Sequence, residues 1–151
     1  MMQLKSRTLV DAMREEDIPE VQAIERQIFP TPWPRNAYYR ELHHNRSAYY
    51  LVLRRDEEIV GYAGLWKMSD EAHITTVGVR ANQQGKGYGH ALMAALIQRA
   101  YQLGSRWLTL EVRPSKSRSD QGLIKVRTTT LNQDGEAVQI LVGNLLVRRR
   151  A

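Results

Sequence analysis

The first half of the chain shows one helical pattern of apolar residues, followed by patterns typical of strands. Ile18, Val21, Ile24 and Ile28 fall on one face of a helix. Asp17, followed by Glu20 three residues later, predicts a capping box with Asp17 as the cap. A short strand is expected over residues 3–10, and a short helix over about 35–43. Three prolines in residues 29–34 separate the two helices.

The middle of the chain alternates between strand and helix signals. Residues 48–55 and 58–68 predict two strands of a hairpin around Asp56-Glu57, and residues 71–80 predict a third strand. A glycine-rich segment, 82–89, then opens a helix to about Leu103, with Gly104 as the residue after its cap. A strand follows over 106–113. This order is a βαβ unit, which predicts a parallel or splayed pair of strands.

The last quarter of the chain predicts a β-hairpin. Residues 123–131 alternate between apolar and polar side chains, as a half-buried strand does. The turn signal Asn132-Gln133-Asp134-Gly135 follows, and residues 136–148 predict a second strand with a bulge at Gly143.

Composition excludes several classes of protein and divides the chain. The 151 residues contain 22 Lys or Arg and 16 Asp or Glu, a net charge of +6. Residues 115–151 hold 7 basic and 3 acidic side chains, so most of the excess lies there. Cysteine is absent, which excludes disulfides and thiolate chemistry. With no apolar run long enough to span a membrane and no signal-peptide core, we expect a single cytoplasmic domain over 1–151.

The chemistry is concentrated in the glycine-rich segment, Gln83 to His90. Glycines at alternate positions let the backbone turn sharply and approach a ligand. The first amides of the following helix lack partners, and with the helix dipole they favour a phosphate or pyrophosphate. A simple tight turn is the alternative. The segment is neither a P-loop nor a dinucleotide-binding fingerprint, because the spacing is G-x-G-x-G.

Residues 71–115 resemble the core of the GNAT acetyltransferases, with Gln84-x-x-Gly87-x-Gly89 matching the family's coenzyme A signature. The resemblance covers about residues 3–115. It implies the GNAT acyl-CoA N-acyltransferase fold, an α/β fold with a mixed, mostly antiparallel sheet flanked by helices. It also implies acetyl-CoA as cofactor and no metal. The cofactor-binding residues that it implies are Val77, Val79, Gln84, Gly85, Lys86, Gly87, Tyr88, Gly89 and His90.

Two further segments resemble the ribosomal-protein-alanine N-acetyltransferases within this superfamily. They are Leu110-Glu111-Val112-Arg113 and the stretch that contains Phe29-Pro30 and Trp33. This resemblance implies that the acceptor is the N-terminal α-amine of a protein, such as a ribosomal protein.

Transfer to an amine requires a base that removes a proton from the amine. Glu111 is the first candidate, because it ends an apolar strand where partial burial favours proton uptake. Glu71 and His73 are alternatives for this role. The alternative is a structural role, in which Glu111 pairs with Arg113 and takes no part in catalysis.

The resemblance stops after residue 115. The family continues with an Asn and a helix that carries the Tyr used as general acid, whereas no Tyr follows Tyr101 here. Residues 116–151 form an atypical hairpin that resembles the last strands of MaoC-like hot-dog dehydratases, without their catalytic residues. Two interpretations are kept: the chain is a chimera joined near residues 115–117, or it is a divergent acetyltransferase. The hairpin edge is expected to allow pairing between chains.

Two other functions are kept as alternatives. The first is a protein that binds acetyl-CoA but is catalytically impaired, because the family's Tyr is missing. The second is a basic nucleic-acid-binding protein, which the run Arg148-Arg149-Arg150 suggests. Such a short run is more typical of a solvated terminus, so no specific nucleic acid is expected.

Overall fold

The computed structural model describes residues 7–110, 121–131 and 137–148. The elements, in chain order, are β1 (Thr8–Ala12), α1 (Ile18–Ile28), α2 (Ala37–His44), β2 (Ala48–Arg55), β3 (Glu58–Met68), β4 (Glu71–Val79), α3 (Tyr88–Gln102), β5 (Trp107–Leu110), β6 (Gln121–Leu131) and β7 (Ala137–Arg148). Short 3-10 turns precede α1 (Glu15–Asp17) and follow β4 (Ala81–Gln83).

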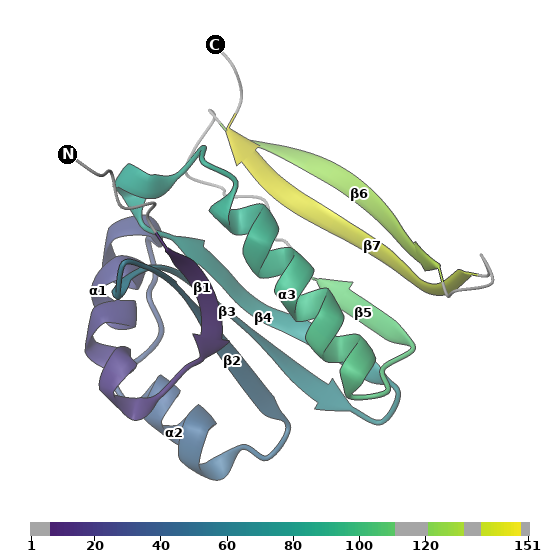
Figure 1. Ribbon diagram of the computed structural model, residues 1–151, viewed down its shortest axis with the longest axis horizontal. Helices are drawn as coiled ribbons and strands as arrows, with labels where there is room; N and C mark the ends of the chain where they lie inside the picture. Colours follow the sequence, from purple (N-terminus) through teal and green to yellow (C-terminus); the bar gives the residue numbers. More distant parts are fainter. Residues whose placement is uncertain (1–6, 111–120, 132–136, 149–151) are drawn as a thin grey trace.

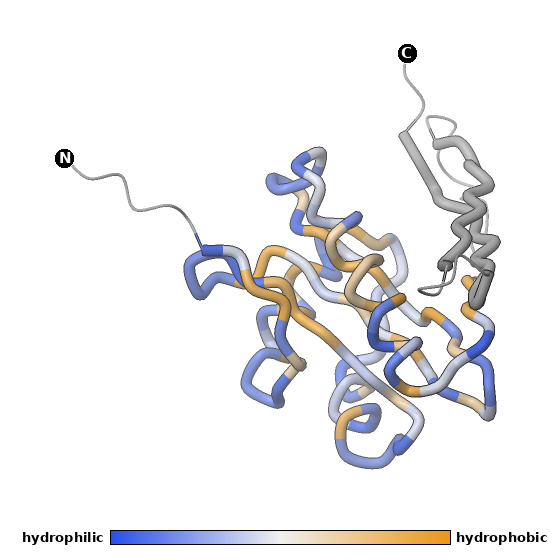
Figure 2. Tube along the Cα trace, turned by 45° about the vertical axis from the view of Figure 1, so that its right-hand side comes forward, coloured by the Kyte–Doolittle hydropathy of each residue, from blue (hydrophilic) through white to orange (hydrophobic). Residues whose placement is uncertain are grey.

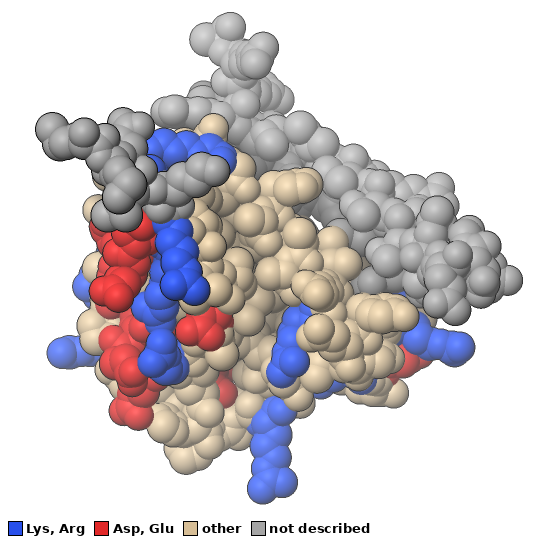
Figure 3. Space-filling model, in the orientation of Figure 1, with Lys and Arg blue, Asp and Glu red and all other residues tan. Residues whose placement is uncertain are grey.

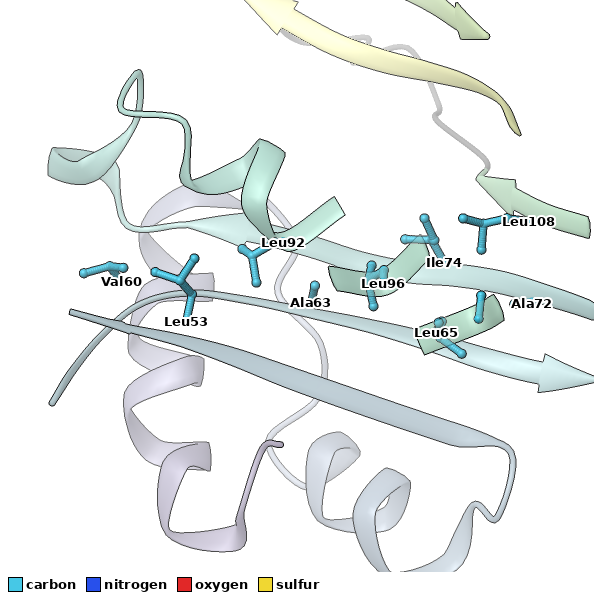
Figure 4. Close-up of a cluster of buried hydrophobic side chains, with 10 residues drawn as sticks. Leu53, Val60, Ala63, Leu65, Ala72, Ile74, Leu92, Leu96 and Leu108 are labelled. Carbon is cyan, nitrogen blue, oxygen red and sulfur yellow. The ribbon is translucent and has the colours of Figure 1, made fainter. Parts of the chain in front are cut away.

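The strands form one seven-stranded sheet in the order β1-β2-β3-β4-β5-β7-β6 (Figure 1). The pairs from β1 to β4 are antiparallel, and β5 lies parallel to β4. Helices cover both faces of the sheet, with α3 on one face and α1 and α2 on the other (Figure 4). The expected α/β fold with a mixed, mostly antiparallel sheet is confirmed, as is the parallel strand pair of the βαβ unit.

The start of the fold differs from two expectations. The first strand occupies Thr8–Ala12, later than the expected 3–10. Helix α1 begins at Ile18 as expected, but Asp17 makes no side-chain hydrogen bond as its cap. Instead, the Asp17 carboxylate accepts a hydrogen bond from the Arg14 amide at 2.9 Å, which closes a capping box on the preceding 3-10 turn. The predicted capping box of Asp17 and Glu20 is therefore wrong. Arg54 binds the Asp17 carboxylate at 2.7 Å, and the Glu20 carboxylate accepts from the Ile59 amide at 3.3 Å.

The sheet separates two buried clusters of different character. Aliphatic side chains from the strands and from Leu92, Leu96 and Ala100 of α3 fill the first cluster (Figure 4). The second also contains three buried aromatic side chains, Tyr38, Tyr50 and Tyr62, which pack with residues of α1. Hydrophobic residues accordingly follow the strands through the centre, while the connecting turns are hydrophilic (Figure 2).

One irregularity in β4 changes which residues face each cluster. Leu65 of β3 pairs with Ile74, but the preceding Gly64 pairs with Thr76, so β4 carries one extra residue, Thr75. Side chains before this bulge and after it therefore alternate out of phase. Ala72 and Ile74 face the aliphatic cluster, and so does Val77.

The C-terminal strands belong to the same sheet as β5. Strand β7 pairs with β5 in parallel and with β6 antiparallel, which leaves β6 at the edge. The expected hairpin is confirmed. The predicted bulge at Gly143 is wrong, because Gly143 pairs regularly with Val126 and the register shift lies at Thr130/Leu131.

Candidate functional site

The loop between β4 and α3 has the backbone geometry that its glycines allow. Gly85 and Gly87 adopt left-handed conformations, with φ of +78° and +86°. A Cβ atom added to either residue would meet no heavy atom within 4 Å, so the space beside both glycines is open. A side chain there would be strained by the backbone and would fill this space, which fits a loop shaped to let a ligand come close.

The backbone amides that follow this loop are available to a ligand. The first hydrogen bond of α3 runs from the Ala91 amide to the Gly87 carbonyl at 3.1 Å. Within the described part of the chain, the amides of Tyr88, Gly89 and His90 have no acceptor. Together with the positive end of the helix dipole, they suit an anion such as a pyrophosphate. The exposed Lys86 adds a positive charge, and its Nζ lies 3.1 Å from Gln83 Oε1.

Strand β4 presents a free backbone edge beside this loop. Strand β5 pairs with β4 only from Glu71 to Ile74, so the rest of β4 has no partner strand on that side among the described residues. The Arg80 amide donates to the Val60 carbonyl of β3 at 2.8 Å. Because neighbouring residues in a strand point their amides to opposite sides, the amides of Val77 and Val79 face the free edge.

Gln84 joins the loop to the end of this edge. Its side-chain amide donates to the Val79 carbonyl at 3.1 Å, from an exposed position. The predicted cofactor residues thus come together as two adjoining rows of backbone groups, one on β4 and one at the start of α3. Coenzyme A offers amide and pyrophosphate groups to such rows, so the residues present fit it.

Of the three predicted bases, the structure describes two. Glu111 lies outside the described residues. Glu71 and His73 are linked through Thr109 of β5, since the Thr109 hydroxyl donates to Glu71 Oε1 at 2.9 Å and lies 2.9 Å from His73 Nδ1. The hydroxyl has one hydrogen, which goes to Glu71, so Nδ1 must be the donor to Thr109. Nε2 of the neutral imidazole then carries the lone pair, and it has no hydrogen-bond partner among the described residues.

A buried acid that sequence reasoning missed lies in α1. Glu25 is 2% exposed, and it accepts hydrogen bonds from the Tyr38 hydroxyl at 2.5 Å, the Trp33 amide at 3.0 Å and the Tyr62 hydroxyl at 3.2 Å. Burial raises the pKa of Tyr38 and of Tyr62 far above the usual value, so both remain donors. A signal was present, because Glu25 falls four residues after Val21, on the apolar face of the helix.

Several aromatic residues are core or sheet-surface side chains. Tyr62 is fully buried, whereas Trp107 is 56% exposed. Trp66 donates from Nε1 to Glu41 Oε2 at 2.8 Å. A cavity of 460 Å³ lies along α1 and the following segment, where Glu25, Trp33 and Tyr39 are among its lining residues.

Charge is mixed over the surface that can be seen. On the face in Figure 3, basic and acidic side chains are interleaved at one side, and the middle is largely uncharged. This face therefore has no continuous basic surface among the described residues. Among the helices of the described residues, none has the length and apolar character needed to cross a bilayer.

Comparison with known proteins agrees with this geometry. Residues 18–125 match the model of the acetyltransferase (GNAT) family. A candidate ribosomal protein bS18-alanine N-acetyltransferase of Bacillus subtilis is 36% identical over 122 residues, which cover 81% of this chain and 80% of that protein. The ribosomal protein bS18-alanine N-acetyltransferase of Haemophilus influenzae is 29% identical over 73% of this chain and 74% of its own length.

Solved structures share the fold. The ribosomal-protein-S18-alanine N-acetyltransferase of Escherichia coli superposes with a TM-score of 0.67 at 19% identity, over 96% of both chains. The aminoglycoside N-acetyltransferase AAC(6')-Iy, solved with CoA, gives a TM-score of 0.64 at 15% identity, over 76% of this chain and 82% of that one.

The family match also bears on the expected junction. It continues to residue 125, into β6 and past the break expected near residues 115–117. The resemblance of the hairpin to hot-dog dehydratases gains no support from these matches. With the coenzyme A signature, the open loop and the free strand edge in place, the chain belongs to the GNAT acetyltransferase family, N-acetyltransferases that use acetyl-CoA.

Proposed function

We propose that this enzyme acetylates the N-terminal alanine of ribosomal protein bS18. The observation that carries the proposal is the 36% identity with the Bacillus subtilis relative over four fifths of both chains. A cytoplasmic location follows from the same proposal, since the substrate belongs to the ribosome. A single domain over residues 1–151 is proposed because the described strands form one sheet.

The proposed cofactor site uses the two rows of backbone groups. The amides of Tyr88, Gly89 and His90, with Gly85, Lys86 and Gly87, bind the pyrophosphate of acetyl-CoA. The amides of Val77 and Val79 bind the pantetheine and acetyl portion along the free edge of β4, and Gln84 holds the loop against this edge. Acetyl-CoA supplies the thioester that the amine attacks. An amide at the edge of β4 stabilises the negative charge that develops on the thioester oxygen.

Glu111 is the proposed base that takes the proton from the α-amine of the acceptor. A protonated amine has no lone pair for attack, so this transfer must come before the new N–C bond forms. The carboxylate gains one proton, and the neutral amine then forms its N–C bond as the C–S bond of the thioester breaks and the thiolate leaves. The nitrogen releases a second proton to solvent as the amide forms. Because no Tyr follows Tyr101, we propose that solvent protonates the thiolate, at a reduced rate.

Glu111→Gln tests this assignment. The amide keeps the size of the side chain but cannot accept the proton, so kcat for an Ala-starting bS18 peptide should fall by about 10²- to 10⁴-fold. Acetyl-CoA should still raise the melting temperature of the variant as it does in the wild type. The same peptide with a blocked N-terminus is the matched substrate control, and equal rates for the two enzymes would show that Glu111 is not the base.

His73 is the alternative base, favoured by its free Nε2. His73→Gln should lower kcat/KM more than Thr109→Val if the imidazole itself takes the proton, because the valine variant keeps the imidazole and loses only its orientation. A full rate in His73→Gln combined with a loss in Glu111→Gln would leave Glu111 as the base.

A catalytically impaired acetyl-CoA-binding protein is the second candidate, favoured by the missing Tyr. It predicts a thermal shift with acetyl-CoA and no peptide acetylation. This candidate includes two further expectations: that the hairpin has a separate lineage, and that chains pair through the β6 edge. Binding to nucleic acid is the third, and it predicts an affinity that falls steeply with salt.

A further inference from the structure

The buried Glu25 connects two parts of the molecule that are distant in the sequence. Its carboxylate accepts three hydrogen bonds: from the Trp33 amide between α1 and α2, from Tyr38 of α2 and from Tyr62 of β3. A carboxylate removed from water is costly unless it is well hydrogen-bonded, so the three donors stabilise it. The carboxylate in turn holds all three donors in fixed places.

The Tyr62 branch of this cluster ends against the free edge of β4. Tyr62 pairs with Gly78 across β3 and β4. A Cβ atom built on Gly78 would lie 2.7 Å from the Cε1, Cζ and hydroxyl oxygen of Tyr62. The hydroxyl end of this ring therefore lies directly on the backbone between Val77 and Val79. A shift of the ring would move or release the strand segment that carries both amides.

The other two branches approach β4 through neighbouring rings, because the Tyr38 ring packs edge-on against Tyr62, with ring centroids 6.2 Å apart, and against Tyr50, with ring centroids 5.7 Å apart. The Trp33 ring stacks on Tyr38, with ring centroids 5.0 Å apart and planes 24° apart. Tyr38 belongs to α2, and the Trp33 amide lies in the segment between the helices. Neither residue touches β4 through a recorded hydrogen bond in the described part of the chain. Glu25 thus holds the Tyr62 ring by a hydrogen bond, whereas Tyr38 meets the same ring by edge-on packing.

We infer that Glu25 is a positioning residue, which fixes the Val77–Val79 edge for acetyl-CoA through the hydroxyl group of Tyr62. The inference rests on the proposed function, because it takes this edge as the binding site of the acetyl portion. Glu25 itself does not touch the cofactor. Its role is to keep the Tyr62 ring in a fixed position against Gly78, so that the amides of Val77 and Val79 stay in place.

A matched pair of variants tests the inference. Tyr62→Phe and Tyr38→Phe each remove one hydroxyl that donates to the same Glu25 oxygen, and both rings are fully buried. Only Tyr62 packs on Gly78. Titration calorimetry with acetyl-CoA should show about three- to tenfold weaker binding for Tyr62→Phe, a loss of the size of one ordinary hydrogen bond. Tyr38→Phe should bind within about twofold of the wild type.

Steady-state kinetics with the bS18 peptide supply a second readout. Tyr62→Phe should raise KM for acetyl-CoA more than it changes KM for the peptide, and Glu25→Gln should follow the same trend. A merely structural role would lower the melting temperatures of both tyrosine variants and leave their acetyl-CoA affinities equal. Equal affinities therefore overturn the inference, even if both variants are less stable.

The two proposals fail in different ways. A wild-type protein without measurable affinity for acetyl-CoA would overturn the cofactor site and this inference together. A wild-type protein that binds acetyl-CoA but does not acetylate the peptide would overturn the proposed acceptor only. Tyrosine variants that both bind as the wild type does would overturn only the positioning role of Glu25.

Discussion

The two faces of the central sheet are buried equally well but by different chemistry. The α3 face is filled by aliphatic side chains such as Leu65, Leu92 and Leu96, which have no polar atoms to satisfy. The opposite face holds Tyr38, Tyr50 and Tyr62, each with a hydroxyl that is hydrogen-bonded to a carboxylate. Aliphatic packing is non-directional, whereas a hydrogen bond fixes distance and angle.

This difference separates two tasks of the molecule. The aliphatic face supplies non-directional stabilisation that attaches α3, and with it the glycine-rich loop, to the sheet. The aromatic face fixes the relative positions of α1, α2 and β4. We therefore expect substitutions on the first face to change mainly stability, and those on the second to change both stability and ligand binding.

The largest expected effect is on the aliphatic face. Leu96→Ala should lower the free energy of unfolding by about 2–5 kcal/mol, because the residue is fully buried and its loss leaves a cavity. Tyr101→Ala on the same helix is the control, since Tyr101 is 58% exposed and should change stability by less than about 0.5 kcal/mol. Urea unfolding measures both, and equal values would mean that α3 does not depend on its buried face.

Glycine substitutions should have opposite effects on the two faces. A Cβ on Gly64 would lie 2.2 Å from the ring of Tyr50, which is held by Glu41 and Thr75, so Gly64→Ala should cost about 1–3 kcal/mol. On Gly89 of α3 it would lie 3.8 Å from Val79, an ordinary contact. Gly89→Ala should therefore stabilise the helix by roughly 0.5 kcal/mol.

Thermal unfolding of the two glycine variants, measured in parallel, tests this contrast. Combining Gly64→Ala with Tyr50→Leu should recover part of the loss, because the smaller side chain makes room for the methyl group. Equal destabilisation by Gly64→Ala and Gly89→Ala would contradict the contrast between the fixed ring beside Gly64 and the ordinary aliphatic contact beside Gly89.

A further effect should appear at alkaline pH, from the buried tyrosines of the aromatic face. Burial raises the pKa of Tyr38, Tyr50 and Tyr62 above their ordinary value of 10.0. Above that value the unfolded chain loses these protons while the folded chain retains them, so stability falls as pH rises. Each tyrosine contributes about 1.4 kcal/mol per pH unit.

Tyr38→Phe should therefore reduce this alkaline slope by about one tyrosine's share. Urea unfolding between about pH 10 and about pH 11.5 measures it, and the wild type corrects for all other groups that titrate there. An unchanged slope in the variant would mean that Tyr38 ionises in the folded protein.

Much of the fold could be predicted from local patterns. The helix over Ile18–Ile28, the hairpin of β2 and β3, and the glycine loop before α3 all appear where apolar spacing and turn residues place them. Gly104 has φ of +79° and follows the cap of α3, as its position after the last apolar turn predicted.

The errors arose where a side chain has a partner far along the chain. Asp17 was expected to cap α1, but Arg54 and the Arg14 amide bind its carboxylate. The bulge expected at Gly143 is absent because the strand on either side pairs in register there. A glycine signals that a bulge is allowed, and only the partner strand decides whether one forms.

The sequence by itself determined the glycine-rich loop before α3 and the aliphatic layer, because both depend on residue type and spacing within one or two neighbouring elements. Only the tertiary structure decided that Glu25 is buried with three donors, and that Thr109 links Glu71 to His73. Tyr62 lies 37 positions from Glu25, and Thr109 lies 36 from His73. No local pattern records such partners, because hydrogen bonds across the fold are chosen by the packing of whole elements.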